Sequence, residues 1–165
     1  MTPAEPDPPT RPRSSASEVI ETYLAEQQIP FRRVENTWAF ALSGEHKHSI
    51  PVVLVLRERT LSVESFFIRA PMDNAAEVYR LLLARNARSS PVRFAADADG
   101  DVLIVGEAIL EMFDSGMLDA LLGAVHANAD EMFDAALTIG FATYLARDLA
   151  WREKAGIPQH EAPKG

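Results

Sequence analysis

The chain has 165 residues, 47% of them apolar, with 16 lysine and arginine side chains against 24 aspartate and glutamate side chains. This length and composition predict one folded domain, and the absence of cysteine excludes disulfides, thiol chemistry and cysteine-ligated metals. No apolar run approaches the roughly 20 residues that a membrane-spanning helix needs, so we expect a cytoplasmic protein with no membrane partner.

Both ends of the chain are predicted to be disordered tails, over residues 1–15 and 155–165. The first tail contains five of the eleven prolines and no large apolar side chain after Met1, and such a segment cannot contribute to a core. The folded part is therefore expected to be a single domain over residues 16–154.

The first half of the folded part reads as a helix followed by a sheet. Ser15 and Glu18 have the spacing of a capping box at a helix start, and Pro30 favours an end to that helix. Trp38 and Phe40 alternate with small residues and should share one face of a strand. Four strands are expected, over residues 31–34, 38–42, 50–56 and 60–69.

The segment 50–56 is apolar at almost every position, which is typical of a central strand that is covered on both faces. The connection from this segment to the next apolar run, residues 57–59, is too short for a crossover. The two strands should therefore pair antiparallel.

The second half contains helices and one hairpin. A helix is expected to open near Asp73, with an apolar stripe that includes Leu82 and Leu83. Asp99 and Gly100 lie between two apolar runs, which predicts a β-hairpin. A C-terminal helix from Met117 should break or kink near residues 127–130, and a last long helix should follow. The predicted fold class is α+β, with an antiparallel sheet made of a meander plus a hairpin.

Almost all of the net charge of −8 lies in residues 94–146, which contain ten acidic and no basic side chains. This segment is either a solvated face that keeps the protein soluble or a surface that attracts cationic partners. Arg80, Arg85 and Arg88 could form a basic patch. Nucleic acid is not an expected partner, because the pI is about 5.0 and aromatic residues do not alternate with the arginines. The patch could instead meet the acidic segment of a second copy in a homodimer.

No pattern in the sequence predicts a catalytic residue, a cofactor or a metal. His46 and His48 alternate but offer only two ligands, and the acidic run near Gly100 lacks the later residues of a calcium loop. His126 and Asp130 could form an acid/base pair, or His126 could mark a helix end. The usual nucleophile and phosphate-binding motifs are absent. Because His126 and Asp130 could form an acid/base pair, a small-ligand or hydrolytic enzyme with a site around His126 is the alternative function.

The stretch from Leu121 to Phe133, which reads as a helix, a polar break and an aromatic restart, resembles the bacterial YbjN family. The Trp-containing meander and the Asp-Gly hairpin extend this resemblance over about residues 16–154. Members of that family are described as sensory-transduction regulators, and their fold is similar to that of type III secretion chaperones. The resemblance implies a chaperone-like, non-catalytic role in bacterial signalling or stress regulation, and it brings no catalytic residues with it.

We therefore predict a non-catalytic domain that binds another protein, or a second copy, through a sheet edge or an apolar helix face. Aromatic side chains of the strands and arginines of the middle helix are the predicted contacts, with core packing as the alternative for the aromatics. They are Trp38, Phe40, Phe66, Phe67, Arg80, Arg85 and Arg88.

Overall fold

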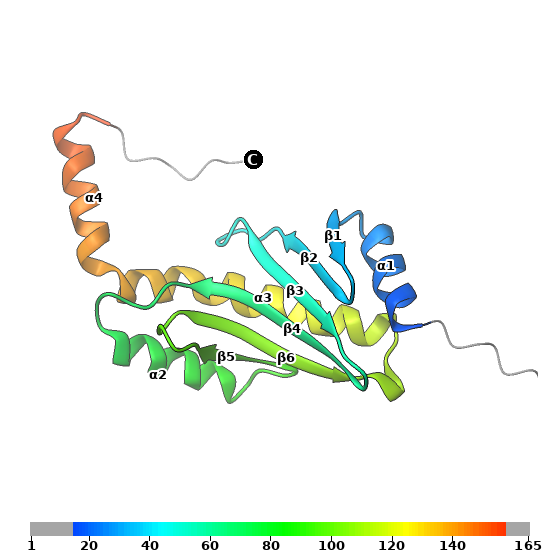
Figure 1. The fold of residues 1–165 in the computed structure, drawn as a ribbon. Helices are drawn as coiled ribbons and strands as arrows, with labels where there is room; N and C mark the ends of the chain where they lie inside the picture. Colours follow the sequence, from blue (N-terminus) through cyan, green and yellow to red (C-terminus); the bar gives the residue numbers. More distant parts are fainter. Residues whose placement is uncertain (1–14, 158–165) are drawn as a thin grey trace, which may run out of the picture.

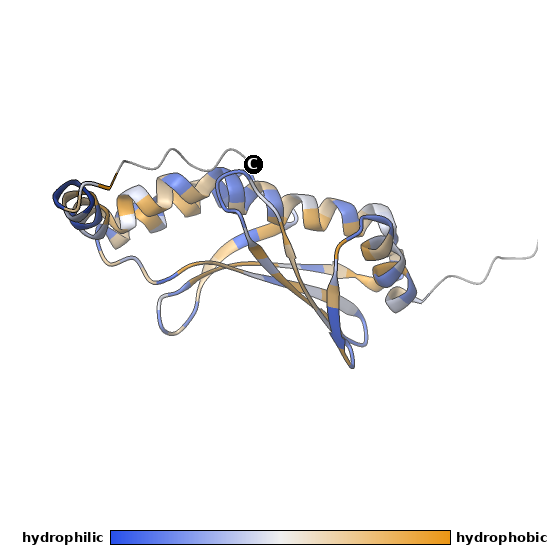
Figure 2. Cartoon of the chain, turned by 90° about the horizontal axis from the view of Figure 1, so that it is seen from above, coloured by the Kyte–Doolittle hydropathy of each residue, from blue (hydrophilic) through white to orange (hydrophobic). Residues whose placement is uncertain are grey.

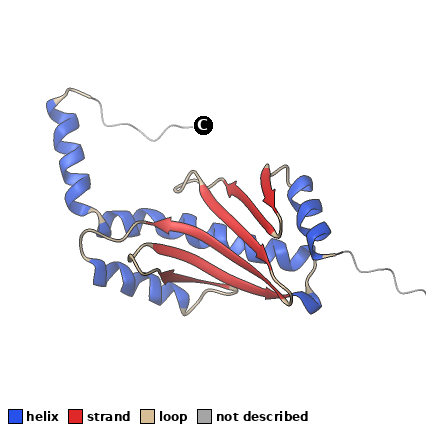
Figure 3. Ribbon diagram, viewed as in Figure 1, coloured by secondary structure: helices blue, strands red, loops and turns tan. Residues whose placement is uncertain are grey.

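The computed structural model describes residues 15–157, which form helices and one sheet (Figures 1 and 3). In chain order the elements are α1 (Ala16–Glu26), β1 (Phe31–Val34), β2 (Thr37–Leu42), β3 (Ile50–Leu56), β4 (Thr60–Ile68), α2 (Ala75–Asn86), β5 (Val92–Ala96), β6 (Val102–Ile109), a 3-10 turn η1 (Leu110–Met112), α3 (Ser115–Gly140) and α4 (Ala142–Lys154). Most residues of the two predicted tails lie outside the described residues, and the domain bounds 16–154 stay a prediction.

Helix α1 begins at the capping box that the sequence predicts. Ser15 Oγ accepts a hydrogen bond from the Glu18 N–H, and the Glu18 carboxylate accepts one from the Ser15 N–H. These bonds satisfy two donors that the first turn of a helix otherwise leaves without partners. The Tyr23 hydroxyl donates to Asp119 of α3 at 2.7 Å, and Leu24 is buried in the core. Helix α1 is therefore fixed against the start of α3.

The six strands form one sheet in the order β1-β2-β3-β4-β6-β5, and every neighbouring pair is antiparallel. Strands β1 to β4 make the predicted meander, and β5 and β6 make the predicted hairpin. The turn of this hairpin places Gly100 at φ +83°, a backbone conformation that glycine adopts without steric cost. The predicted α+β class with an antiparallel sheet is confirmed.

Helices α1, α2 and α3 all lie on one side of the sheet (Figure 2). The core fills the space between this side and the helices, and its largest fully buried members are Trp38, Phe67, Ile20, Leu24, Ile50, Leu54, Leu61, Ile104, Leu118 and Leu121. The prediction that β3 is covered on both faces is wrong. Ile50, Val52 and Leu54 are buried, whereas Val53 and Val55 on the other face are only half-buried, because no described helix crosses that face.

Helix α2 starts near Asp73 as predicted, but its apolar stripe is rotated. Val78 and Leu82 are buried, whereas Leu83, which we expected in the stripe, is 65% exposed. Successive residues of a helix point about 100° apart. Helix α2 packs against α3 and β5 with Leu82 on its buried side, so Leu83 points toward solvent.

Helix α3 runs without interruption through residues 127–130, so the predicted break there is wrong. Asn128 does not cap a second helix. Its side chain is buried, and its Nδ2 donates to the Ala124 carbonyl one turn earlier at 2.8 Å. Its Oδ1 accepts hydrogen bonds from Arg85 Nε at 2.9 Å and from Ser89 Oγ at 2.8 Å. Arg85 of α2 and Ser89, three residues beyond the end of α2, thus bind the side-chain oxygen that the sequence pattern assigns to a cap.

The break in the C-terminal helices falls at Gly140 instead. A Cβ at Gly140 would lie 3.1 Å from a methyl group of Val78 and 3.2 Å from Pro71, so this close approach favours glycine. The Asp73 carboxylate accepts hydrogen bonds from the backbone N–H and the hydroxyl of Thr143, each at 2.9 Å. Helix α4 then leaves the body at a steep angle (Figure 1), and none of its residues is buried.

Candidate partner-binding surfaces

The side of the sheet opposite the helices is a broad surface that no described element covers (Figure 2), and we call it the open face. Strand side chains alternate between the two sides of a sheet, so the residues between the buried positions point to this side. Most of them are apolar. The apolar members are Val34, Ala39, Ala41, Pro51, Val53, Val55, Phe66, Ala95, Leu103, Val105 and Ile109.

A few charges interrupt the apolar surface of the open face. The strand register aligns Val53, Glu64, Val105 and Arg93 in one row across four strands, and Glu107 lies one row further along β6. A shallow groove of about 600 Å³ follows these residues over the middle of the sheet. An extended apolar surface with isolated charges of both signs matches a protein partner better than a small ligand.

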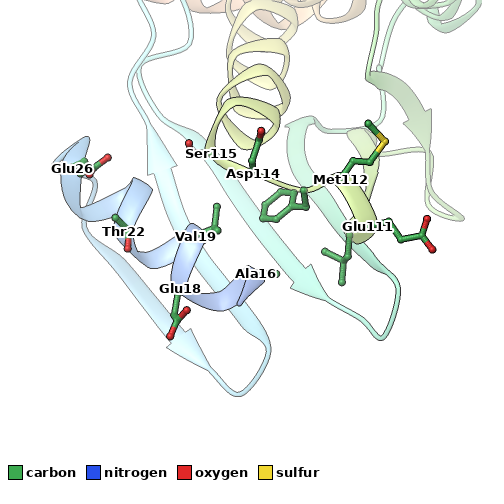
Figure 4. Close-up of a pocket in the computed structure, with 11 residues that line it drawn as sticks. Ala16, Glu18, Val19, Thr22, Glu26, Glu111, Met112, Asp114 and Ser115 are labelled. Atoms are coloured by element: carbon green, nitrogen blue, oxygen red, sulfur yellow. The ribbon is translucent and has the colours of Figure 1, made fainter. Parts of the chain in front are cut away.

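A second concave surface lies between α1 and the segment that joins β6 to α3 (Figure 4). We call it the acidic groove, and its volume is about 730 Å³. Its lining includes four carboxylates and no lysine, arginine or histidine. The lining residues are Ala16, Glu18, Val19, Thr22, Glu26, Leu110, Glu111, Met112, Phe113, Asp114 and Ser115.

The loop between β2 and β3 is fastened to α3 by the buried side chain of Asp130. Its Oδ1 accepts hydrogen bonds from the backbone N–H groups of His46 at 2.8 Å and Lys47 at 2.9 Å. Burial raises the pKa of Asp130, but hydrogen bonds from the loop backbone outweigh this effect and hold the pKa below its ordinary value of 3.8. His46 Nδ1 also lies 2.6 Å from Asp134 Oδ2. The loop and the helix therefore form one polar unit.

We expect this loop contact to be strongest between pH 3.8 and 6.5. The hydrogen bond to Asp134, followed by its negative charge, raises the pKa of His46 above 6.5. The stabilisation from His46 is therefore complete below pH 6.5 and is lost as pH rises through the raised pKa. The lowered pKa of Asp130 makes stability depend on pH in the opposite direction. The stabilisation from Asp130 is complete above pH 3.8 and is lost as pH falls through the lowered pKa.

An NMR titration of the His46 ring checks this pH dependence. Asp134→Asn should return the pKa of His46 toward 6.5, because the main hydrogen-bond partner loses its charge. A His46 pKa that is the same in both proteins would contradict the role of Asp134.

The structure does not bring His126 and Asp130 together as an acid/base pair. His126 Nε2 is 2.9 Å from the Ser43 carbonyl, and Asp130 is bonded to the loop backbone. His126 lies in the interior of α3, so the alternative prediction that His126 marks a helix end is also wrong. Within residues 15–157, no three His, Asp or Glu side chains are placed to hold a metal ion.

The predicted aromatic contacts divide between the two sides of the sheet. Trp38, Phe40 and Phe67 lie in the core, where core packing, the stated alternative, describes their position. Phe66 is 36% exposed and belongs to the open face. Alternation alone could not assign these positions, because it does not say which side of the sheet the helices cover.

The predicted arginine contacts are also separated. Arg80 is exposed on α2, and Arg88 is exposed two residues beyond the end of this helix. Arg85 is half-buried and pairs with Glu131 of α3 at 2.8 Å in addition to its bond with Asn128. The open face was not among the surfaces predicted from the sequence, although the apolar positions on both sides of 50–56 were a signal for it.

The sequence matches the model of the YbjN family, described as "Putative bacterial sensory transduction regulator", over residues 16–138. The chain belongs to the YbjN family. Uncharacterized proteins of Mycobacterium bovis and Mycobacterium tuberculosis are 37% identical over 115 residues, which cover 70% of this chain and 63% of each relative. The match therefore spans less than two thirds of the length of these relatives.

Solved structures at low sequence identity share the YbjN-family fold. YbjN of E. coli has a TM-score of 0.50 at 13% identity, covering 68% of this chain and 87% of that chain. The ExsC–ExsE complex contains a chain with a TM-score of 0.54 at 14% identity, covering 71% and 90%. The ExoU–SpcU complex of the Pseudomonas aeruginosa type III secretion system gives 0.50 at 22% identity, covering 67% and 91%. The predicted likeness to the type III secretion chaperone fold is confirmed.

No helix within residues 15–157 is both long enough and apolar enough to cross a bilayer.

Proposed function

We propose that this YbjN-family chain is a non-catalytic, chaperone-like domain that binds another protein on the open face of its sheet. The observation that carries this proposal is the mismatch between the two sides of β3. The strand has apolar side chains on both sides, yet residues 15–157 place helices over only one of them. A regulatory role in bacterial signalling or stress and a cytoplasmic location belong to the same proposal, and the family description supports the regulatory part.

The chemistry of the open face supports a protein partner. Each fully buried valine or leucine side chain contributes about 1.5–3 kcal/mol, and the half-buried Val53, Val55, Leu103 and Val105 still expose part of their surface. A partner that covers these side chains buries their remaining apolar surface, and this burial stabilises the complex. The few charges of the row around Glu64 would then select among partners, because an unpaired charge in an interface is costly.

Substitution of two central valines tests the surface. Val53→Lys with Val105→Lys should leave the protein folded, because each long lysine stem can lie along the sheet while its ammonium group reaches water. We expect the substituted protein to lose a partner that wild type retains in affinity capture from the native host. Sedimentation of the purified chain shows in the same variants whether that partner is a second copy.

The matched control is Ala120→Lys with Ala84→Lys, which adds the same charge at exposed positions of α3 and α2. It should retain the partner. Equal capture by the two double variants would mean that the open face is not the binding surface.

A further inference from the structure

We propose that helix α4 of one chain docks on the open face of a second copy of the chain. This inference rests on the proposed function, because it takes the open face as the binding surface, and it names another copy as the partner. Among the α-helices of residues 15–157, α4 alone has no buried residue. Its contacts with a second copy would supply the cover that both surfaces lack.

Four large side chains of α4 are exposed and lie within one half of its circumference, because successive residues of a helix are turned by about 100°. They are Tyr144 (62% exposed), Leu145 (37%), Leu149 (47%) and Trp151 (61%). We call this half the apolar face of α4. A helix of 13 residues is marginally stable in water without packing, so a cover on the apolar face also stabilises the helix itself.

One ion pair interrupts the apolar face of α4. Asp148 and Arg152 lie one turn apart, with 2.8 Å between Asp148 Oδ2 and Arg152 Nε. The open face has the same composition, because Glu64 and Arg93 lie in one row on either side of Val105. When the two surfaces meet, the arginine of the sheet can face Asp148. The glutamate of the sheet can face Arg152, so each charge meets its opposite.

The length of α4 matches the width of the open face. Its 13 residues make a helix about 20 Å long. Neighbouring strands lie about 4.8 Å apart, so the strands from β2 to β5 in the sheet order span roughly 19 Å. A helix that crosses these strands covers the row of Glu64 and Arg93 together with the valines beside it. The shallow groove of about 600 Å³ over the middle of the sheet can receive the aromatic side chains of the helix.

The helix must come from a second copy, because α4 lies on the other side of its own sheet. Figure 2 shows α4 end-on at the level of α3, on the helix side, whereas the open face is the opposite side. The Asp73 carboxylate holds the start of α4 there through two hydrogen bonds from Thr143. The later turns of α4 extend away from the body (Figure 1), where another molecule can reach them.

Sedimentation equilibrium of the full-length chain tests the proposal. We expect the wild type to self-associate and Leu149→Lys to weaken the association by about tenfold or more, because a charge replaces an apolar side chain of the interface. Ala150→Lys is the matched control. It adds the same charge at the next exposed residue, which is turned by about 100° from Leu149, and it should associate as wild type does. Val53→Lys with Val105→Lys should weaken the association as Leu149→Lys does.

An exchange of charges tests the pairing between α4 and the sheet. Asp148→Arg and Arg93→Glu should each weaken the association, since each substitution brings like charges together. The chain that carries both substitutions should regain the association, because two arginines of α4 then meet two glutamates of the sheet.

Four results would overturn the proposal. They are a wild-type chain that sediments as a monomer, equal weakening by Leu149→Lys and Ala150→Lys, an association that survives the two lysines on the sheet, and a double charge exchange without recovery. The proposed function is judged separately by capture from the native host. A captured partner that Val53→Lys with Val105→Lys loses supports that function even when the purified chain is a monomer.

Discussion

Gly44→Ala should lower the free energy of unfolding by about 2–4 kcal/mol. A Cβ at Gly44 would lie 2.7 Å from the Lys47 carbonyl and 2.9 Å from the Asp130 carboxyl carbon, and closer still to Asp130 Oδ1. Relief of this overlap requires Asp130 to move away from the loop. The N–H groups of His46 and Lys47 then lose the acceptor that they share. Urea-induced unfolding measures the loss.

Gly123→Ala is the matched control, because nothing lies within 4 Å of the Cβ position on the exposed side of α3. Alanine is favoured over glycine inside a helix by about 1 kcal/mol, so this change should raise stability. Replacement of glycine by alanine is thus expected to lower the free energy of unfolding at Gly44 and to raise it at Gly123. An alanine at Gly44 without cost would mean that the loop does not close on Asp130.

Asn128→Ala should lower the free energy of unfolding by about 2–3 kcal/mol. The Asn128 amide is buried and joins the end of α2 to the middle of α3 through Arg85 and Ser89. Its removal leaves the half-buried Arg85 Nε without its acceptor, and an unpaired donor of a charged group is costly. Thermal or urea unfolding, together with amide exchange at the end of α2, measures the effect.

Glu131→Ala is the control for Asn128→Ala. It removes the other partner of Arg85, but the Glu131 side chain is 58% exposed, and exposed ion pairs contribute about 0–1 kcal/mol. Equal losses from the two substitutions would show that the ion pair to Arg85, rather than the buried amide, joins the two helices.

The sequence was sufficient where local rules decide the structure. The capping box at Ser15 fixes the start of α1 with residues three positions apart, and the Asp-Gly turn fixes the β5–β6 hairpin in the same way. The arrangement of the predicted elements resembles the YbjN family, and the family match confirms this resemblance.

The errors arose where partners distant in sequence decide the outcome. Asn128 has the same local pattern whether it caps a new helix or serves as a buried acceptor. Its partner Arg85 lies 43 positions away, so a reading of neighbouring residues favours the cap. The binding of Asp130 to the loop at His46 spans 84 positions and has no local signature at all.

The open face illustrates a different limit of sequence reasoning. The apolar pattern of 50–56 correctly indicates that both sides of β3 favour an apolar environment, but a pattern cannot say whether the cover comes from the same chain. Only the position of the helices shows that no element of the described part of the chain covers Val53 and Val55. Residues of a binding surface and residues of a core thus have the same appearance in a sequence.

Helix α4 has a consequence for how this protein can diverge. The family match ends at residue 138, before α4 begins, and none of the side chains of α4 is buried. Exposed substitutions usually change stability by less than about 0.5 kcal/mol. Mutations can therefore accumulate on the exposed side chains of α4 with little loss of stability in the body, which leaves this helix free to diverge in what it contacts.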